Sequence, residues 1–62
     1  MKDKKKYIRK LAQMNWDCGH PFDPCDFTMF KKLCKEDGYQ MTPSDFDYYF
    51  ECFDYCREAA YN

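Results

Sequence analysis

Residues 42–60 read TPSDFDYYFECFDYCREAA, and this stretch decides the fold class. Thr42 is a good N-cap, Pro43 suits the first helical position, and Asp45 follows Thr42 by three residues, as in a capping box. Apolar residues then recur at the spacing of one helix face. That face consists of Phe46, Tyr49, Phe50, Phe53 and Ala60. The pattern predicts a helix over about residues 43–60.

The remaining surface of this predicted helix carries the strongest candidates for contact with a partner. An acidic stripe opposite the apolar face consists of Asp47, Glu51, Asp54 and Glu58, and a strip between the two consists of Tyr48, Tyr55 and Ala59. Trp16 and Phe22, expected in the first loop, add two further exposed rings. Tyr and Trp are enriched at interface hot spots. The alternatives are a solvated acidic face and rings that a small core leaves exposed.

A second helix is predicted over about residues 24–37. Asp23 is placed to act as the N-cap, Pro24 suits the first turn, and Gly38 is a typical stop signal. Its apolar face consists of Phe27, Phe30, Leu33 and Cys34.

A first, amphipathic helix is predicted over about residues 3–15. Its apolar side consists of Tyr7, Ile8, Leu11 and Met14. Its opposite side is strongly basic and carries Lys2, Lys6, Arg9 and Lys10.

The composition favours an aromatic-rich core in one small domain that spans residues 1–62. Aromatic residues make up 21% of the chain, whereas Ile8, Leu11 and Leu33 are its only Ile or Leu residues and Val is absent. Each large ring buries about 150–250 Å² of surface, so rings can supply the apolar area that aliphatic residues lack. The sequence therefore predicts an all-α fold, a small three-helix bundle with an aromatic-rich core.

Charge is separated along the chain although the formal net charge is only −1. Residues 1–31 carry seven Lys or Arg against four Asp, and residues 32–62 carry three against seven Asp or Glu. The charged start is not followed by a signal-peptide core, and no segment reaches the roughly 20 apolar residues of a membrane span. We therefore expect a cytoplasmic chain with reduced cysteines and no membrane partner.

The cysteines offer a candidate structural zinc site. Cys18 and His20 lie in or beside the first loop, and Cys52 and Cys56 are spaced i, i+4 on the last predicted helix. A loop pair and a helix pair together supply the four Cys or His ligands of a tetrahedral site, with Cys25 as a possible replacement. The alternative is that small apolar cysteines fill gaps between rings.

The basic first helix makes nucleic acid the alternative partner. Lys2, Lys6, Arg9 and Lys10 would supply phosphate contacts that do not depend on base sequence. The slightly acidic chain, with a pI of about 5.7, lacks the strongly basic character typical of such domains.

No arrangement in the sequence favours catalysis. A nucleophile at Cys18 would need an oriented imidazole, an oxyanion site and a cleft, which three short helices rarely form. The sequence thus predicts a small non-enzymatic protein-interaction module, a regulator or inhibitor that docks on a larger protein through Tyr48, Glu51, Tyr55 and Glu58. The alternative is a zinc-stapled domain that binds nucleic acid through its first helix.

Overall fold

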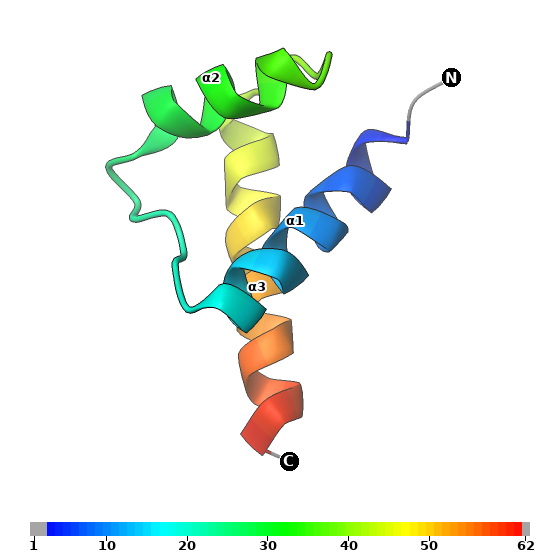
Figure 1. The fold of residues 1–62 in the computed structure, drawn as a ribbon, viewed down its shortest axis with the longest axis vertical. Helices are drawn as coiled ribbons and strands as arrows, with labels where there is room; N and C mark the ends of the chain where they lie inside the picture. The colour runs from blue at the N-terminus through cyan, green and yellow to red at the C-terminus, as the bar shows by residue number, and fades with distance from the viewer. Residues whose placement is uncertain (1–2, 62) are drawn as a thin grey trace.

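Three α-helices form the fold in the computed structural model, which describes residues 3–61. They are α1 (Lys4–Cys18), α2 (Phe27–Glu36) and α3 (Pro43–Tyr61). The longest helix, α3, is central: α1 crosses it near its middle, and α2 lies across its N-terminal part (Figure 1). No strand occurs within residues 3–61. The predicted all-α fold with three helices and an aromatic-rich core is confirmed.

The start of α3 forms the predicted capping box. The Asp45 N–H donates to Thr42 Oγ1 at 3.3 Å, and the Asp45 carboxylate accepts the Thr42 N–H at 2.8 Å. Lys4 of α1 donates to the same carboxylate at 3.0 Å. The cap therefore ends the preceding loop and also ties the first turn of α1 to the first turn of α3.

α1 ends three residues later than the sequence predicts, at Cys18. Asp3 caps its start by accepting the Lys6 N–H at 3.1 Å. Its end is set by Gly19, whose φ of 72° is in the left-handed region and whose N–H bonds to carbonyls of the last turn. Glycine adopts this conformation without the steric cost that other residues meet. The helix thus continues until the first residue that readily reverses the chain.

The predicted start of α2 at Pro24 is wrong by three residues, because Asp23 and Pro24 form a turn instead. The Asp26 N–H donates to the Asp23 carbonyl at 2.9 Å, and the Asp26 carboxylate accepts the Asp23 N–H at 3.1 Å. Proline is favoured at the second position of such a turn as well as in the first turn of a helix. The helix begins at Phe27 after this turn, with Asp26 in the cap position.

The core is built around Tyr49, which is fully buried. Its hydroxyl accepts hydrogen bonds from Asn15 Nδ2 at 2.6 Å and from the Phe22 N–H at 3.3 Å, so it joins α1, α3 and the loop between α1 and α2. Its ring packs against Phe30 and Phe46, with centroids 5.4 and 6.1 Å away. The buried core residues are Ile8, Ala12, Phe30, Cys34, Met41, Phe46 and Tyr49.

Several residues of the predicted apolar faces lie outside this core. Met14 and Leu33 remain 54% and 45% exposed, and Ala60 is exposed near the end of α3. α1 crosses α3 near its middle rather than running along its whole length, so the C-terminal part of α3, which includes Ala60, extends beyond α1 (Figure 1). The rings expected to be exposed in the first loop are instead half-buried: Trp16 belongs to α1 and packs edge-on against Phe53.

Candidate functional site

A groove of about 460 Å³ lies between α1 and one side of α3, which we call the outer side of α3. Arg9 and Gln13, one turn apart, form the α1 side. The α3 side shows the i, i+3, i+4, i+7, i+8 spacing of a single helix face, which brings these side chains into one row. It consists of Tyr48, Glu51, Cys52, Tyr55 and Cys56. The lining is mostly apolar, so the groove suits an apolar side chain of a partner, which would be removed from water on binding.

Tyr48 forms one end of the groove and is held by α1. Arg9 Nη1 donates to the Tyr48 hydroxyl at 3.1 Å. The Lys5 ammonium lies 5.8 Å from the centre of the Tyr48 ring, which is within the range of a cation–π contact. The Tyr48 ring is therefore half-buried rather than exposed as predicted, and these contacts fix its position in the wall of the groove.

Cys52 and Cys56 line the groove from successive turns of α3. The Cys56 thiol donates to Gln13 Oε1 at 3.3 Å, and Gln13 in turn donates to Asp17 at 3.0 Å. Burial raises the pKa of the Cys56 thiol, and the neighbouring Cys52 and Asp17 raise it further. The Cys56 sulfur is therefore a neutral thiol at neutral pH and contributes a polarizable apolar surface to the groove.

Tyr55 and Glu51 supply the exposed rim. Tyr55 is 73% exposed, and Glu51 is also exposed. Three of the four residues predicted to bind a partner, Tyr48, Glu51 and Tyr55, thus lie around one groove. The fourth, Glu58, is exposed on the same helix but does not line the groove.

The acidic stripe beside the groove remains available to solvent. Asp47, Glu51, Asp54 and Glu58 are all exposed. Asp54 pairs with Arg57 at 3.1 Å, but both side chains are more than half exposed, and a pair of this kind contributes only about 0.3–0.5 kcal/mol. The outer side of α3 is consequently negative, and it would favour a partner that carries basic groups.

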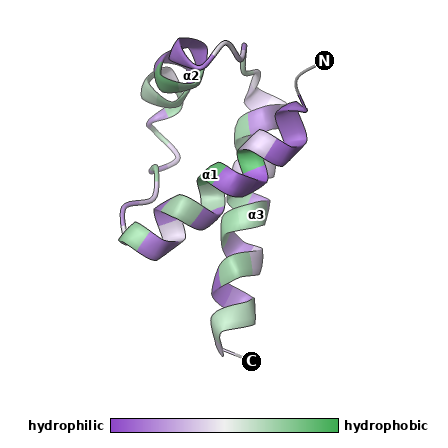
Figure 2. Ribbon diagram, turned by 45° about the vertical axis from the view of Figure 1, so that its right-hand side comes forward, coloured by the Kyte–Doolittle hydropathy of each residue, from purple (hydrophilic) through white to green (hydrophobic). Residues whose placement is uncertain are grey.

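The basic side chains predicted for nucleic-acid contact are divided between two roles. Lys6 and Lys10 are exposed and form no ion pair with any residue from 3 to 61, whereas Arg9 is bound to Tyr48. Lys2 lies outside the described residues. The strongly hydrophilic start of α1 is visible in Figure 2. Tertiary contacts therefore use part of the basic face to join α1 to α3.

The four predicted zinc ligands are not assembled into one site. Cys18 and His20 are exposed at the end of α1 and in the following loop, whereas Cys52 and Cys56 are half-buried in the groove. In the described part of the chain, no three or more His, Cys, Asp or Glu side chains are grouped so that they could hold a metal ion. Cys52 and Cys56 instead pack at the junction of α1 and α3.

Sequence reasoning missed Gln13 and the contribution of Arg9 to the groove. Gln13 is polar and lies beside the basic face of α1, so only its packing against α3 reveals its position.

Between residues 3 and 61, no helix has the length and apolar character needed to cross a membrane. Comparisons with family models, characterised proteins and solved structures give no match to this chain.

Proposed function

We propose that this chain is a small, non-enzymatic protein-interaction module that binds a partner protein in the groove between α1 and α3. The single observation that carries this proposal is an open, mostly apolar groove with Tyr55 and Glu51 exposed on its rim. Interfaces commonly combine an apolar centre with a polar rim and are enriched in tyrosine.

The size and rigidity of the groove suit a protein side chain. Its volume of about 460 Å³ accommodates one or two large apolar side chains of a docked segment. Tyr48 is already held by Arg9 and Lys5, so little additional ordering is required when a partner docks against it. The exposed Tyr55 then supplies the ring that becomes buried on binding.

The charge beside the groove indicates the chemistry of the partner. Glu51 and Glu58 are exposed on the same side of α3, about two turns apart, and Asp47 and Asp54 extend the negative surface. We therefore expect a partner segment that presents an apolar anchor flanked by Lys or Arg. We place this interaction in the cytoplasm, where cysteines are kept as thiols.

Affinity capture with quantitative mass spectrometry tests this proposal through two matched tyrosine variants. Tyr55 and Tyr61 are 73% and 82% exposed on the same helix, but only Tyr55 lines the groove. Tyr55→Ala and Glu51→Lys should each deplete the proteins captured by the wild-type chain, whereas Tyr61→Ala should retain them. Equal capture by all variants, or equal loss in Tyr55→Ala and Tyr61→Ala, would remove the groove from the proposal.

A second candidate function is nucleic-acid binding through α1, which is favoured by the exposed side chains of Lys6 and Lys10, neither of which pairs with a carboxylate of residues 3–61. The acidic surface of α3 opposes it, because phosphate is repelled there. Filter binding of DNA and RNA at low and high salt decides between the two. Retention that falls steeply with salt and disappears in a Lys6→Glu/Lys10→Glu variant would support the nucleic-acid function.

A further inference from the structure

A second hollow, of about 610 Å³, lies beside α2 on a part of the molecule that the groove does not include. It is formed where Gly38, with a φ of 87°, reverses the chain after α2. The Gly38 N–H bonds to the Lys35 carbonyl at 2.9 Å, and the Tyr39 N–H bonds to the Cys34 carbonyl at 3.0 Å. The segment that leads to α3 is thereby folded back along α2. The lining residues are Lys31, Lys32, Lys35, Tyr39, Gln40 and Met41.

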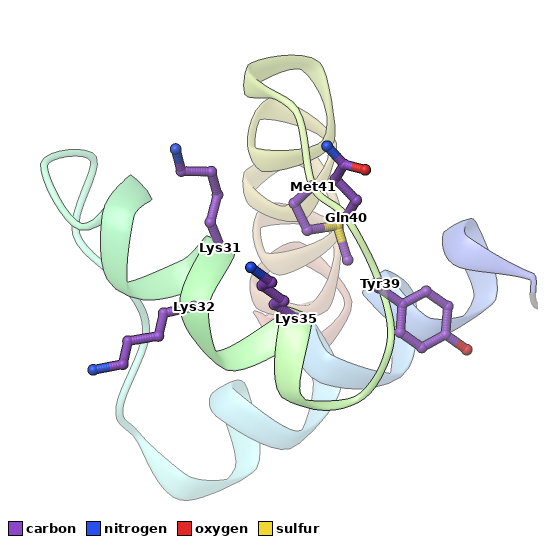
Figure 3. A pocket seen from close by; sticks show the side chains of 6 residues that line it. All are labelled: Lys31, Lys32, Lys35, Tyr39, Gln40 and Met41. Atoms are coloured by element: carbon purple, nitrogen blue, oxygen red, sulfur yellow. The ribbon is translucent and has the colours of Figure 1, made fainter.

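Among residues 3–61, the charged side chains that line this hollow are all positive. Lys31, Lys32 and Lys35 are exposed, and none forms an ion pair with a residue from 3 to 61. The Lys31 ammonium lies 4.8 Å from the centre of the Phe27 ring, a contact that positions the amine but does not neutralise it. In Figure 3, Lys31 and Lys35 extend on the side of α2 near Gln40 and Met41. An anionic group in the hollow would meet both amines.

The opposite wall of the hollow supplies apolar and amide surface. Met41 is a core residue that is only 5% exposed, so the part of it that reaches the hollow is firmly positioned. Gln40 is exposed beside it and carries an amide that can bond to a peptide backbone. The hollow thus combines cationic, apolar and amide groups.

We propose that this hollow is a docking site for an acidic segment of a second protein, with carboxylates bound by Lys31 and Lys35 and an apolar side chain placed against Met41. Charge complementarity favours this occupant: amines that pair with no carboxylate of residues 3–61 occupy one wall, and Gln40 and the accessible edge of Met41 lie opposite. This site does not depend on the groove between α1 and α3. With both sites occupied, the chain would join two partners.

A protein segment fits these features better than a nucleic acid does. Proteins that bind single strands use exposed rings as stacking platforms along a continuous basic groove. Tyr39, the one ring that the described part of the chain places in the hollow, is half-buried, and Tyr7 stacks on one of its faces with centroids 4.2 Å apart. The acidic surface of α3 also repels a long polyanion more strongly than a short peptide.

The test measures the binding of a short fluorescein-labelled peptide, rich in glutamate with one leucine, by fluorescence anisotropy. A Lys31→Glu/Lys35→Glu variant should weaken the binding by about tenfold or more, since two attractions become repulsions. A Lys6→Glu/Lys10→Glu variant is the matched control, because it makes the same change in net charge on exposed residues of α1. Its affinity should change by no more than about twofold.

Amide chemical shifts locate the bound peptide. In a two-dimensional nitrogen–proton spectrum, Lys35, Gln40 and Met41 should shift on titration, while Tyr48 and Tyr55 should not. The proposal is overturned if the two double variants weaken binding equally, or if the shifts are confined to the groove. It is also overturned if a single-stranded oligonucleotide binds more tightly than the peptide and depends on the same two lysines. Circular dichroism verifies that each variant is folded.

Discussion

Removal of one buried oxygen atom, in Tyr49→Phe, tests how the three helices are held together. The hydroxyl of Tyr49 accepts bonds from Asn15 on α1 and from the Phe22 N–H in the following loop, at 2.6 and 3.3 Å. Phenylalanine keeps the ring and its packing, so the substitution removes these bonds alone. Both donors are then left in partly buried positions without their acceptor.

The expected loss of unfolding free energy is about 1–2 kcal/mol, because a typical hydrogen bond contributes about 1 kcal/mol and the longer bond to Phe22 contributes less. A chain of this size has a total unfolding free energy of about 3–9 kcal/mol. A loss of 1 kcal/mol lowers Tm by about 4–8 °C in a domain this small. The substitution should therefore remove a substantial share of the stability without changing the fold.

Urea denaturation followed by circular dichroism measures the effect, with Tyr55→Phe as the control. Tyr55 loses the same atom but is 73% exposed, so its variant should stay within about 0.5 kcal/mol of wild type. A double-mutant cycle with Asn15→Ala isolates the shorter bond. Equal stabilities for Tyr49→Phe and Tyr55→Phe, or a coupling energy of zero, would refute the role assigned to the hydroxyl.

Two further predictions concern Asp45 and the cysteines. Burial by itself raises the pKa of Asp45, but the bonds from Thr42 and Lys4 outweigh it and hold the pKa below its ordinary value. Its stabilising contribution is therefore complete above the unfolded pKa of about 3.9 and is lost as the pH falls through the lower folded value. Asp45→Asn should cost about 1 kcal/mol at neutral pH and should weaken the pH dependence of Tm in acid, whereas an unchanged acid transition in thermal melts would contradict this assignment. Alkylation with iodoacetamide, followed by mass spectrometry, should modify the exposed Cys18 and Cys25 first and Cys34 last, because Cys34 is fully buried and burial raises the pKa of its thiol. Modification of Cys34 at the rate of Cys18 would show that the core opens readily.

The helix boundaries show where local sequence reasoning holds and where it fails. The capping box of Thr42 and Asp45 was predictable because its bonds join residues only three positions apart. Asp23 and Pro24 were misread because the same residue types suit a turn and a helix start. The bonds between Asp23 and Asp26 select the turn.

The candidate sites were predictable only in part. Helical periodicity placed Tyr48, Glu51 and Tyr55 on the outer side of α3, and the structure places all three around the groove. It did not reveal that Arg9 would bind Tyr48, because these residues are 39 positions apart. The hollow beside α2 had a weaker signal, three lysines within five residues, which becomes a site only when the chain folds back along the helix.

The sequence by itself determined the number of helices, the capping of α3 and the aromatic character of the core, because these depend on neighbouring residues and on composition. Only the tertiary structure decided which faces meet. It buries Ala12, leaves Leu33 exposed and turns Tyr49 into the common acceptor of two segments. The physical reason is that periodicity defines the direction of a side chain about its own helix axis but not the angle at which two helices cross. That angle depends on how large rings pack across the whole domain.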